Sequence, residues 1–193
     1  MRHRFAMTLA VLIAAASAAR AEEVVIDFEK AEIGKPVPTW TEKGVVFNLA
    51  GPLVRSKAKG RVMFFPHLGT NRKGILNAMA TEQAIPVQAT FPGSASAVTL
   101  VLWGSTGCPA LIEALDKNGE VVDKASIALV PGRKAPADPV PFVELTVKAP
   151  AIAAIRFSGP RDGEFLAVDE LRFTRVETRS GGKQDSPVRQ PVL

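Results

Sequence analysis

Carboxylates near the two ends of the sequence are the side chains best suited to hold a hard cation. Asp27 and Glu29 follow an apolar run near the start of the chain, and Asp169 lies inside an apolar run near its end. A carboxylate on a buried face must be hydrogen-bonded, paired with a cation or bound to a metal. If the first and last strands are neighbours, these oxygens converge and favour calcium. In the alternative, Asp169 pairs with an arginine or caps a loop.

A second set of residues could recognise a ligand. The ring of Trp40, in a loop region, could be a platform for a sugar or could pack over one end of the fold. His67, Arg72 and Lys73 fall in the most polar internal loop, 66–74, where they could hold an anionic group or remain solvated. The chain has two tryptophans and no tyrosine, which weakens the case for sugar recognition, and we expect Trp103 to lie in the core.

Motifs of the common enzyme classes are missing from the sequence. There is no Gly-x-Ser-x-Gly elbow, the segment 104–108 lacks the lysine of a phosphate loop, and two histidines with one cysteine are too few for a zinc centre. No pair of acids is singled out for glycoside hydrolysis. The single Cys108 excludes an internal disulfide and is interpreted as a buried structural side chain rather than a nucleophile. We therefore expect a protein that is not an enzyme.

The elements that would position these residues are short strands. Apolar runs are separated by turns, and 15 glycines and 15 prolines argue against a helical bundle. Residues 109–119 could form a helix, but the Asn118–Gly119 turn signal and the strands on both sides favour a hairpin. The pattern predicts an all-β, antiparallel β-sandwich, with strands at 23–28, 44–49, 61–65, 75–80, 87–91, 97–103, 111–115, 121–129, 142–147, 152–157 and 164–176.

The last predicted strand places Asp169 in the middle of an apolar stripe. Side chains two residues apart share one face of a strand. That period predicts one face made of Phe165, Ala167, Asp169, Leu171 and Phe173. We therefore expect the Asp169 carboxylate to point into the sandwich.

Several segments, in the same order along the chain, resemble the galactose-binding-domain-like jelly rolls of exported bacterial proteins. They are VIDFE at 25–29, GVVF at 44–47, ALDKNGEVV at 114–122, IAAIRFSG at 152–159 and FLAVDELRF at 165–173. The resemblance spans about residues 23–175 and implies a sandwich of the jelly-roll type. It also implies a structural calcium held by Asp169 in the closing strand and by Asp27 or Glu29 in the opening one. Glu170 stands where many relatives have aspartate.

The resemblance implies a non-catalytic module that binds carbohydrate or another cell-envelope component. A structural or protein-interaction domain without a small ligand is the alternative, and a hydrolase is the third possibility. The sugar-binding residues of that group vary, so none is carried over to this chain.

The first 21 residues have the features of an export signal. Met1–Arg4 is basic, 5–16 is apolar apart from Thr8, and Ala19 and Ala21 are the small residues that precede a cleavage site. We expect cleavage after Ala21, a sandwich domain over 22–176, a disordered tail over 177–193, and a periplasmic or secreted protein. A permanent N-terminal anchor is the alternative, and no other apolar run has the length of a membrane span.

The charge of the chain gives no support to nucleic-acid binding. Three positive charges and no negative ones belong to the predicted signal, so +2 of the net +5 remains in the rest. A nucleic-acid-binding domain is expected to carry a concentrated basic stripe, which this sequence lacks.

Overall fold

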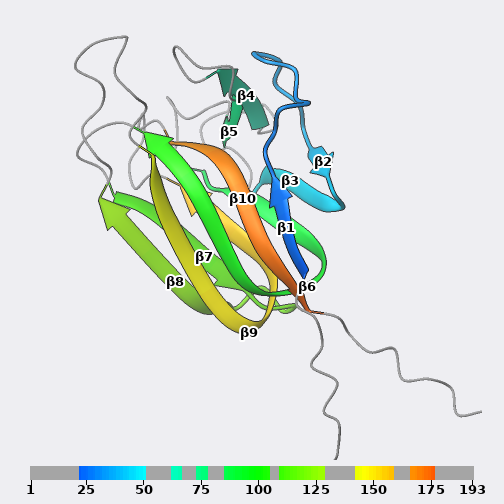
Figure 1. The fold of residues 1–193 in the computed structure, drawn as a ribbon, viewed down its shortest axis with the longest axis vertical. Helices are drawn as coiled ribbons and strands as arrows, with labels where there is room; N and C mark the ends of the chain where they lie inside the picture. Colours follow the sequence, from blue (N-terminus) through cyan, green and yellow to red (C-terminus); the bar gives the residue numbers. More distant parts are fainter. Residues whose placement is uncertain are drawn as a thin grey trace, which may run out of the picture.

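The computed structural model describes residues 22–50, 62–66, 73–77, 85–104, 109–128, 142–158 and 166–176. These residues form strands and turns (Figure 1). Within these ranges, no helix has the length and apolar character needed to cross a membrane. The predicted export signal and tail lie outside them and stay predictions.

Ten strands make up the described part of the fold. They are β1 (Glu22–Ile26), β2 (Trp40–Glu42), β3 (Val45–Leu49), β4 (Val62–Pro66), β5 (Lys73–Asn77), β6 (Val87–Gly104), β7 (Pro109–Leu115), β8 (Val121–Ala128), β9 (Val143–Ser158) and β10 (Leu166–Val176). The short β2 was not predicted from the sequence.

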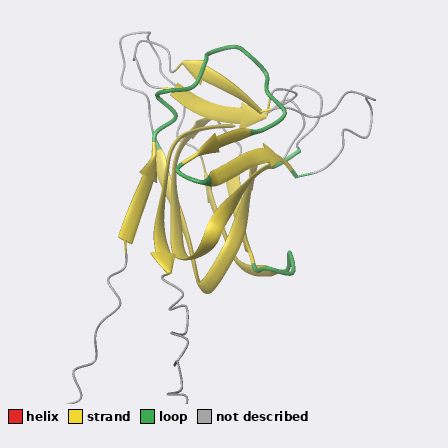
Figure 2. Ribbon diagram, turned by 90° about the vertical axis from the view of Figure 1, so that its right-hand side faces the viewer, coloured by secondary structure: helices red, strands yellow, loops and turns green. Residues whose placement is uncertain are grey.

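The strands form two antiparallel layers (Figure 2). The pairing register shows that β6 and β9 run through both of them. The first layer has the order β8, β7, end of β9, start of β6, β3 and β2. The second has the order start of β9, end of β6 and β10, and the far edge of β10 pairs with both β1 and β5. This arrangement confirms the prediction of an all-β, antiparallel sandwich of the jelly-roll type.

Both shared strands were predicted as pairs of shorter strands. Residues 87–90 of β6 pair with 154–157 of β9 in the first layer, and 97–102 pair with 143–148 in the second. The register shifts between these two stretches, and Pro92 and Gly93 at the turn of β6 are exposed. The break in the sequence pattern is therefore a bend within one strand rather than a loop between two.

Apolar side chains of both layers fill the space between them. The largest fully buried ones are Phe28, Phe47, Phe64, Ile26, Ile75, Leu100, Leu102, Ile112, Ile152, Ile155 and Leu171. The ring of Phe28 lies at the centre of an aromatic group, with its centroid 5.3 Å from that of Phe47 and 6.1 Å from that of Phe64.

Two hairpins follow the turn chemistry of their sequences. Lys43 and Gly44 both have positive φ angles, 48° and 82°, as a two-residue hairpin of type I′ requires. In the β7–β8 hairpin, Gly119 has a φ of 81°, and the Asp116 carboxylate accepts the N–H groups of Asn118 and Glu120 at 2.8 and 2.9 Å. The hairpin prediction for this segment is therefore confirmed over the helix alternative.

The predicted single apolar face of β10 is wrong. Val168 lies opposite Leu102, but Leu171 lies opposite Leu100, so β10 has one extra residue between these pairs. Directly opposed residues share a face. Val168 and Leu171 therefore both face the core, and Ala167 faces away from it. The residues of β10 that face the core are the even-numbered ones before the bulge at Asp169 and the odd-numbered ones after it. A pattern with a strict period of two does not predict this change.

Candidate functional site

Two places in the fold gather residues that could do chemistry. The first, here called the strand junction, is where β1 and β5 meet end to end beside β10. Ile26, the last residue of β1, lies opposite Leu171, and Ile75 of β5 lies opposite Val168. The bulged Asp169 therefore lies between the partners of the two strands. Its side chain is 1% exposed, which confirms the expectation that it is buried.

The loop that follows β1 turns sharply away from the junction. Phe28 has a φ of 57°, in the left-handed region that a side chain rarely adopts. The Asp27 carboxylate accepts the N–H of Glu29 at 3.2 Å, and the N–H of Ala31 donates to the carbonyl of Phe28 at 3.0 Å. The turn buries the Phe28 ring and leaves Asp27 and Glu29 exposed.

Lys73, the first residue of β5, binds this loop through three hydrogen bonds. Its ammonium donates to the backbone carbonyls of Glu29, at 2.5 Å, and of Ala31, at 3.0 Å. Its backbone N–H donates to Oε1 of the Glu29 side chain at 3.0 Å. One residue of β5 therefore engages both main-chain and side-chain oxygens of the loop.

These contacts bear on the predicted calcium ligands. Asp27, Glu29 and Asp169 all belong to the region around the junction, but within the described ranges no group of three or more acidic, histidine or cysteine side chains could hold a metal ion. The Glu29 oxygens that a cation would use accept hydrogen bonds from Lys73 instead. As they lie, the described residues do not fit a calcium ion, and the calcium site stays a prediction.

The second place, here called the outer face, is the side of the second layer that points away from the core. Its residues come from β6, β9 and β10 and lie opposite one another: Thr99, Val101, Trp103, Glu144, Thr146, Ala167, Glu170 and Arg172. The face is exposed to very different degrees along its length. Ala167 is fully buried, whereas the Glu144 side chain is 61% exposed.

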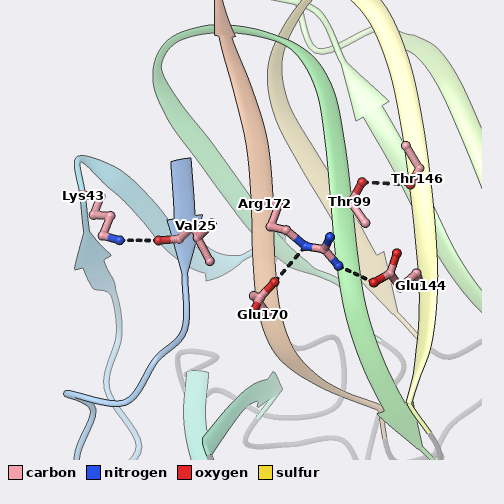
Figure 3. A network of polar contacts seen from close by, with 7 residues as sticks. All are labelled: Val25, Lys43, Thr99, Glu144, Thr146, Glu170 and Arg172. Atoms are coloured by element: carbon pink, nitrogen blue, oxygen red, sulfur yellow. Dashed lines mark hydrogen bonds and ion pairs between the residues drawn. The ribbon is translucent and has the colours of Figure 1, made fainter. Parts of the chain in front are cut away.

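Arg172 is the centre of a polar network on the outer face (Figure 3). Its guanidinium pairs with Glu144 of β9, and its Nε lies 2.7 Å from Oε1 of Glu170. The hydrogen bond to Glu144 raises the pKa of Arg172. Beside this network, the hydroxyl oxygens of Thr99 and Thr146 lie 2.8 Å apart. The face thus carries two carboxylates, one guanidinium and two hydroxyl groups at fixed positions.

Trp103 belongs to the outer face, whereas the sequence predicted it in the core. Val98, Leu100 and Leu102 are the fully buried residues of this part of β6, so Trp103 has the opposite orientation and is half-buried. The alternation was hidden because Val101 and Trp103 are also apolar. The threonine at position 99, between two buried residues, was the signal that could have revealed it.

The residues predicted to bind a ligand lie away from the outer face or outside the described residues. Trp40 is half-buried, and its ring packs edge-on against Phe64 with centroids 4.9 Å apart, which favours the packing alternative. His67, Arg72 and Cys108 lie outside the described residues, so their roles stay predictions.

Comparisons with known proteins show remote likeness. No family model and no curated protein matches the chain. Among solved structures, it is similar to a family 29 carbohydrate-binding module from Piromyces equi, with 9% identity, 81% of this chain and 91% of that chain covered, and a TM-score of 0.48. It is also similar to an arabinose-bound α-L-arabinofuranosidase of family 51, with 12% identity, 68% of this chain and 23% of that chain covered, and a TM-score of 0.41. A family 6 carbohydrate-binding module is similar with 11% identity, 79% of this chain and 94% of that chain covered, and a TM-score of 0.36. At this level of likeness no family membership follows, and the fold rests on the strand pairing described above.

Proposed function

We propose that this chain is an exported, non-catalytic module that binds carbohydrate on the outer face of its second layer. The observation that carries the proposal is Arg172, which is held between two carboxylates in the same layer as a half-buried tryptophan. The predicted export signal and the resemblance to galactose-binding-like jelly rolls agree with it.

The chemistry of the outer face suits sugar hydroxyl groups. A hydroxyl both donates and accepts a hydrogen bond, so a guanidinium beside a carboxylate can satisfy both of its needs. The Glu144 side chain is 61% exposed, which leaves its oxygens accessible to a ligand. Trp103 adds an apolar ring of the kind that packs against sugars. Because these side chains belong to paired strands, little order has to be gained on binding.

The charge of the face favours a neutral glycan over an acidic one. Glu144 and Glu170 contribute two negative charges, and Arg172 contributes one positive charge. A uronic acid or a sulfated sugar placed there would meet a net negative field, and like charges held close together cost binding energy.

Binding to neutral oligosaccharides tests the proposal directly. A glycan array identifies a ligand, and calorimetry compares the wild-type chain with Arg172→Met. A hydrogen bond to a charged group contributes about 1.5–3 kcal/mol, so Kd should rise about tenfold or more. Arg156→Met is the matched control, because Arg156 pairs with Glu113 at 3.1 Å on the first layer. An unchanged Kd in Arg172→Met, or an equal loss in the control, would contradict the proposed face.

A protein-interaction domain is the second candidate. Val121 and Val122 are large apolar side chains exposed on β8, which ends the first layer within the described residues. A strand of that kind can accept a strand or an apolar surface from another protein. Co-purification of a cell-envelope partner, with no glycan bound on the array, would favour this candidate. Turnover of a glycoside or an ester would instead favour the hydrolase.

A further inference from the structure

We infer that the ammonium of Lys73 is the resident cation of the strand junction, in the place where the sequence predicted calcium. The junction then needs no metal, and its stability depends on one lysine. The inference is independent of the outer face, so it stands or fails separately from the proposed carbohydrate binding.

The oxygens around Lys73 are those that a hard cation uses. Calcium takes backbone carbonyls and carboxylates as ligands. Here the carbonyls of Glu29 and Ala31 both accept from one ammonium, and the Glu29 carboxylate accepts the N–H of the same residue. An ammonium has three donors and a full positive charge, so it can satisfy such oxygens without a metal.

The fold itself delivers the lysine to this position. Ile75 is held opposite Val168, next to the bulge, and Lys73 precedes it by two residues at the start of β5. The loop is held from the other side by the burial of Phe28, which leaves its backbone in the left-handed region. The carbonyls of Glu29 and Ala31 are therefore fixed by the main-chain path.

Without a cation, the carbonyls of Glu29 and Ala31 would lose a hydrogen-bond donor, and the folded state would be less stable. The contact between Lys73 and the Ala31 carbonyl is partly buried, and a polar group that loses its partner away from water costs free energy. The ammonium of Lys73 therefore supplies the partner that the loop carbonyls need.

Thermal melting of the signal-free chain tests the inference. Lys73→Met keeps the length of the side chain and removes its charge, and we expect the melting midpoint to fall by about 5 °C or more. Lys35→Met is the matched control, because Lys35 belongs to the same loop region but is exposed and pairs with the side chain of Glu32, at 3.0 Å. Equal midpoints in the two variants would overturn the inference. If Lys73→Met does not fold and Lys35→Met does, the dependence on Lys73 is established.

Calcium separates a cation site from ordinary packing. In the wild-type chain, neither chelator nor millimolar calcium should move the midpoint, because the ammonium occupies the oxygens. In Lys73→Ala, the same carbonyls and carboxylate remain, and calcium should raise the midpoint by mass action. A wild-type midpoint that falls in chelator would restore the calcium site and overturn the inference. A Lys73→Ala protein that calcium leaves unchanged would overturn it as well, since the loop oxygens would then form no cation site.

Discussion

The strand junction and the outer face each contain a basic side chain next to a glutamate. The basic side chain binds the backbone at the junction and binds carboxylates on the outer face. At the junction, Lys73 bonds to the backbone carbonyls of Glu29 and Ala31, which belong to a loop 42–44 residues away. On the outer face, Arg172 forms ion pairs with the side chains of Glu144 and Glu170. The first arrangement fixes the path of the chain, whereas the second only positions side chains.

We infer from this difference that the charge of Lys73 stabilises the fold, whereas the charge of Arg172 is available to bind a ligand. A ligand can replace a partner carboxylate on an exposed face, because the carboxylate can turn toward water. It cannot replace a main-chain carbonyl without moving the loop that carries it. We therefore expect substitutions at the junction to change stability, and substitutions on the outer face to change binding.

The largest effect is expected from Phe28→Ala, which removes the ring that anchors the loop of the junction. Phe28 is fully buried against Phe47 and Phe64, and truncation of such a residue costs about 3–5 kcal/mol. Urea unfolding measures the loss. Phe28→Leu, which fills most of the space, should lose much less. The Kd of the folded fraction for a glycan should not change, and a parallel loss of affinity would break the separation between the two regions.

A smaller effect on stability is expected from Arg172→Met. Glu144 is 61% exposed, so water screens its attraction to the guanidinium, and an exposed ion pair contributes about 0–1 kcal/mol. The pair with Glu170 is more buried, at 29% and 21% exposure, and adds to the loss. The urea midpoint should therefore fall by less than in Phe28→Ala, while glycan affinity falls. A loss of stability as large as that of Phe28→Ala would assign Arg172 to the fold rather than to recognition.

The smallest effect is expected at Asp116, which belongs to neither region. The N–H of Glu120 holds the pKa of this exposed carboxyl below its ordinary value of 3.8, with further help from Asn118 and Gly119. A lowered pKa in the folded chain gives stability that is present above pH 3.8 and is lost as the pH falls through the lower value. Asp116→Asn should therefore flatten the loss of stability in acid. Urea midpoints between pH 2 and pH 6 measure it, and an unchanged slope would contradict the assignment.

Local patterns predicted the strands, but not the irregularities that shape the two regions. Alternation and turn residues predicted β3, β7, β8 and β10 to within two residues of their ends, because a turn signal adjoins each of them in the sequence. The bulge at Asp169 was missed because residues 165–173 keep a period of two in sequence across the extra residue. Only the partner strand shows that the register has shifted.

The sites were predicted in part for the same reason. Burial of Asp169 followed from its apolar neighbours, but the contact between Lys73 and Glu29 depends on which strands share the edge of β10. Arg172 and Glu144 are 28 residues apart in the sequence, and neither has a residue type or spacing that marks it as functional. Such contacts are properties of topology, which residue periodicity does not encode.

The continuous course of β6 and β9 from one layer into the other has a mechanical consequence. Two lengths of covalent backbone join the layers, in addition to the side chains packed between them. Sliding one layer across the other would bend those backbones as well as disturb the packing. The backbone of β6 and β9, as well as the packing between the layers, therefore fixes the position of the surface that carries Arg172.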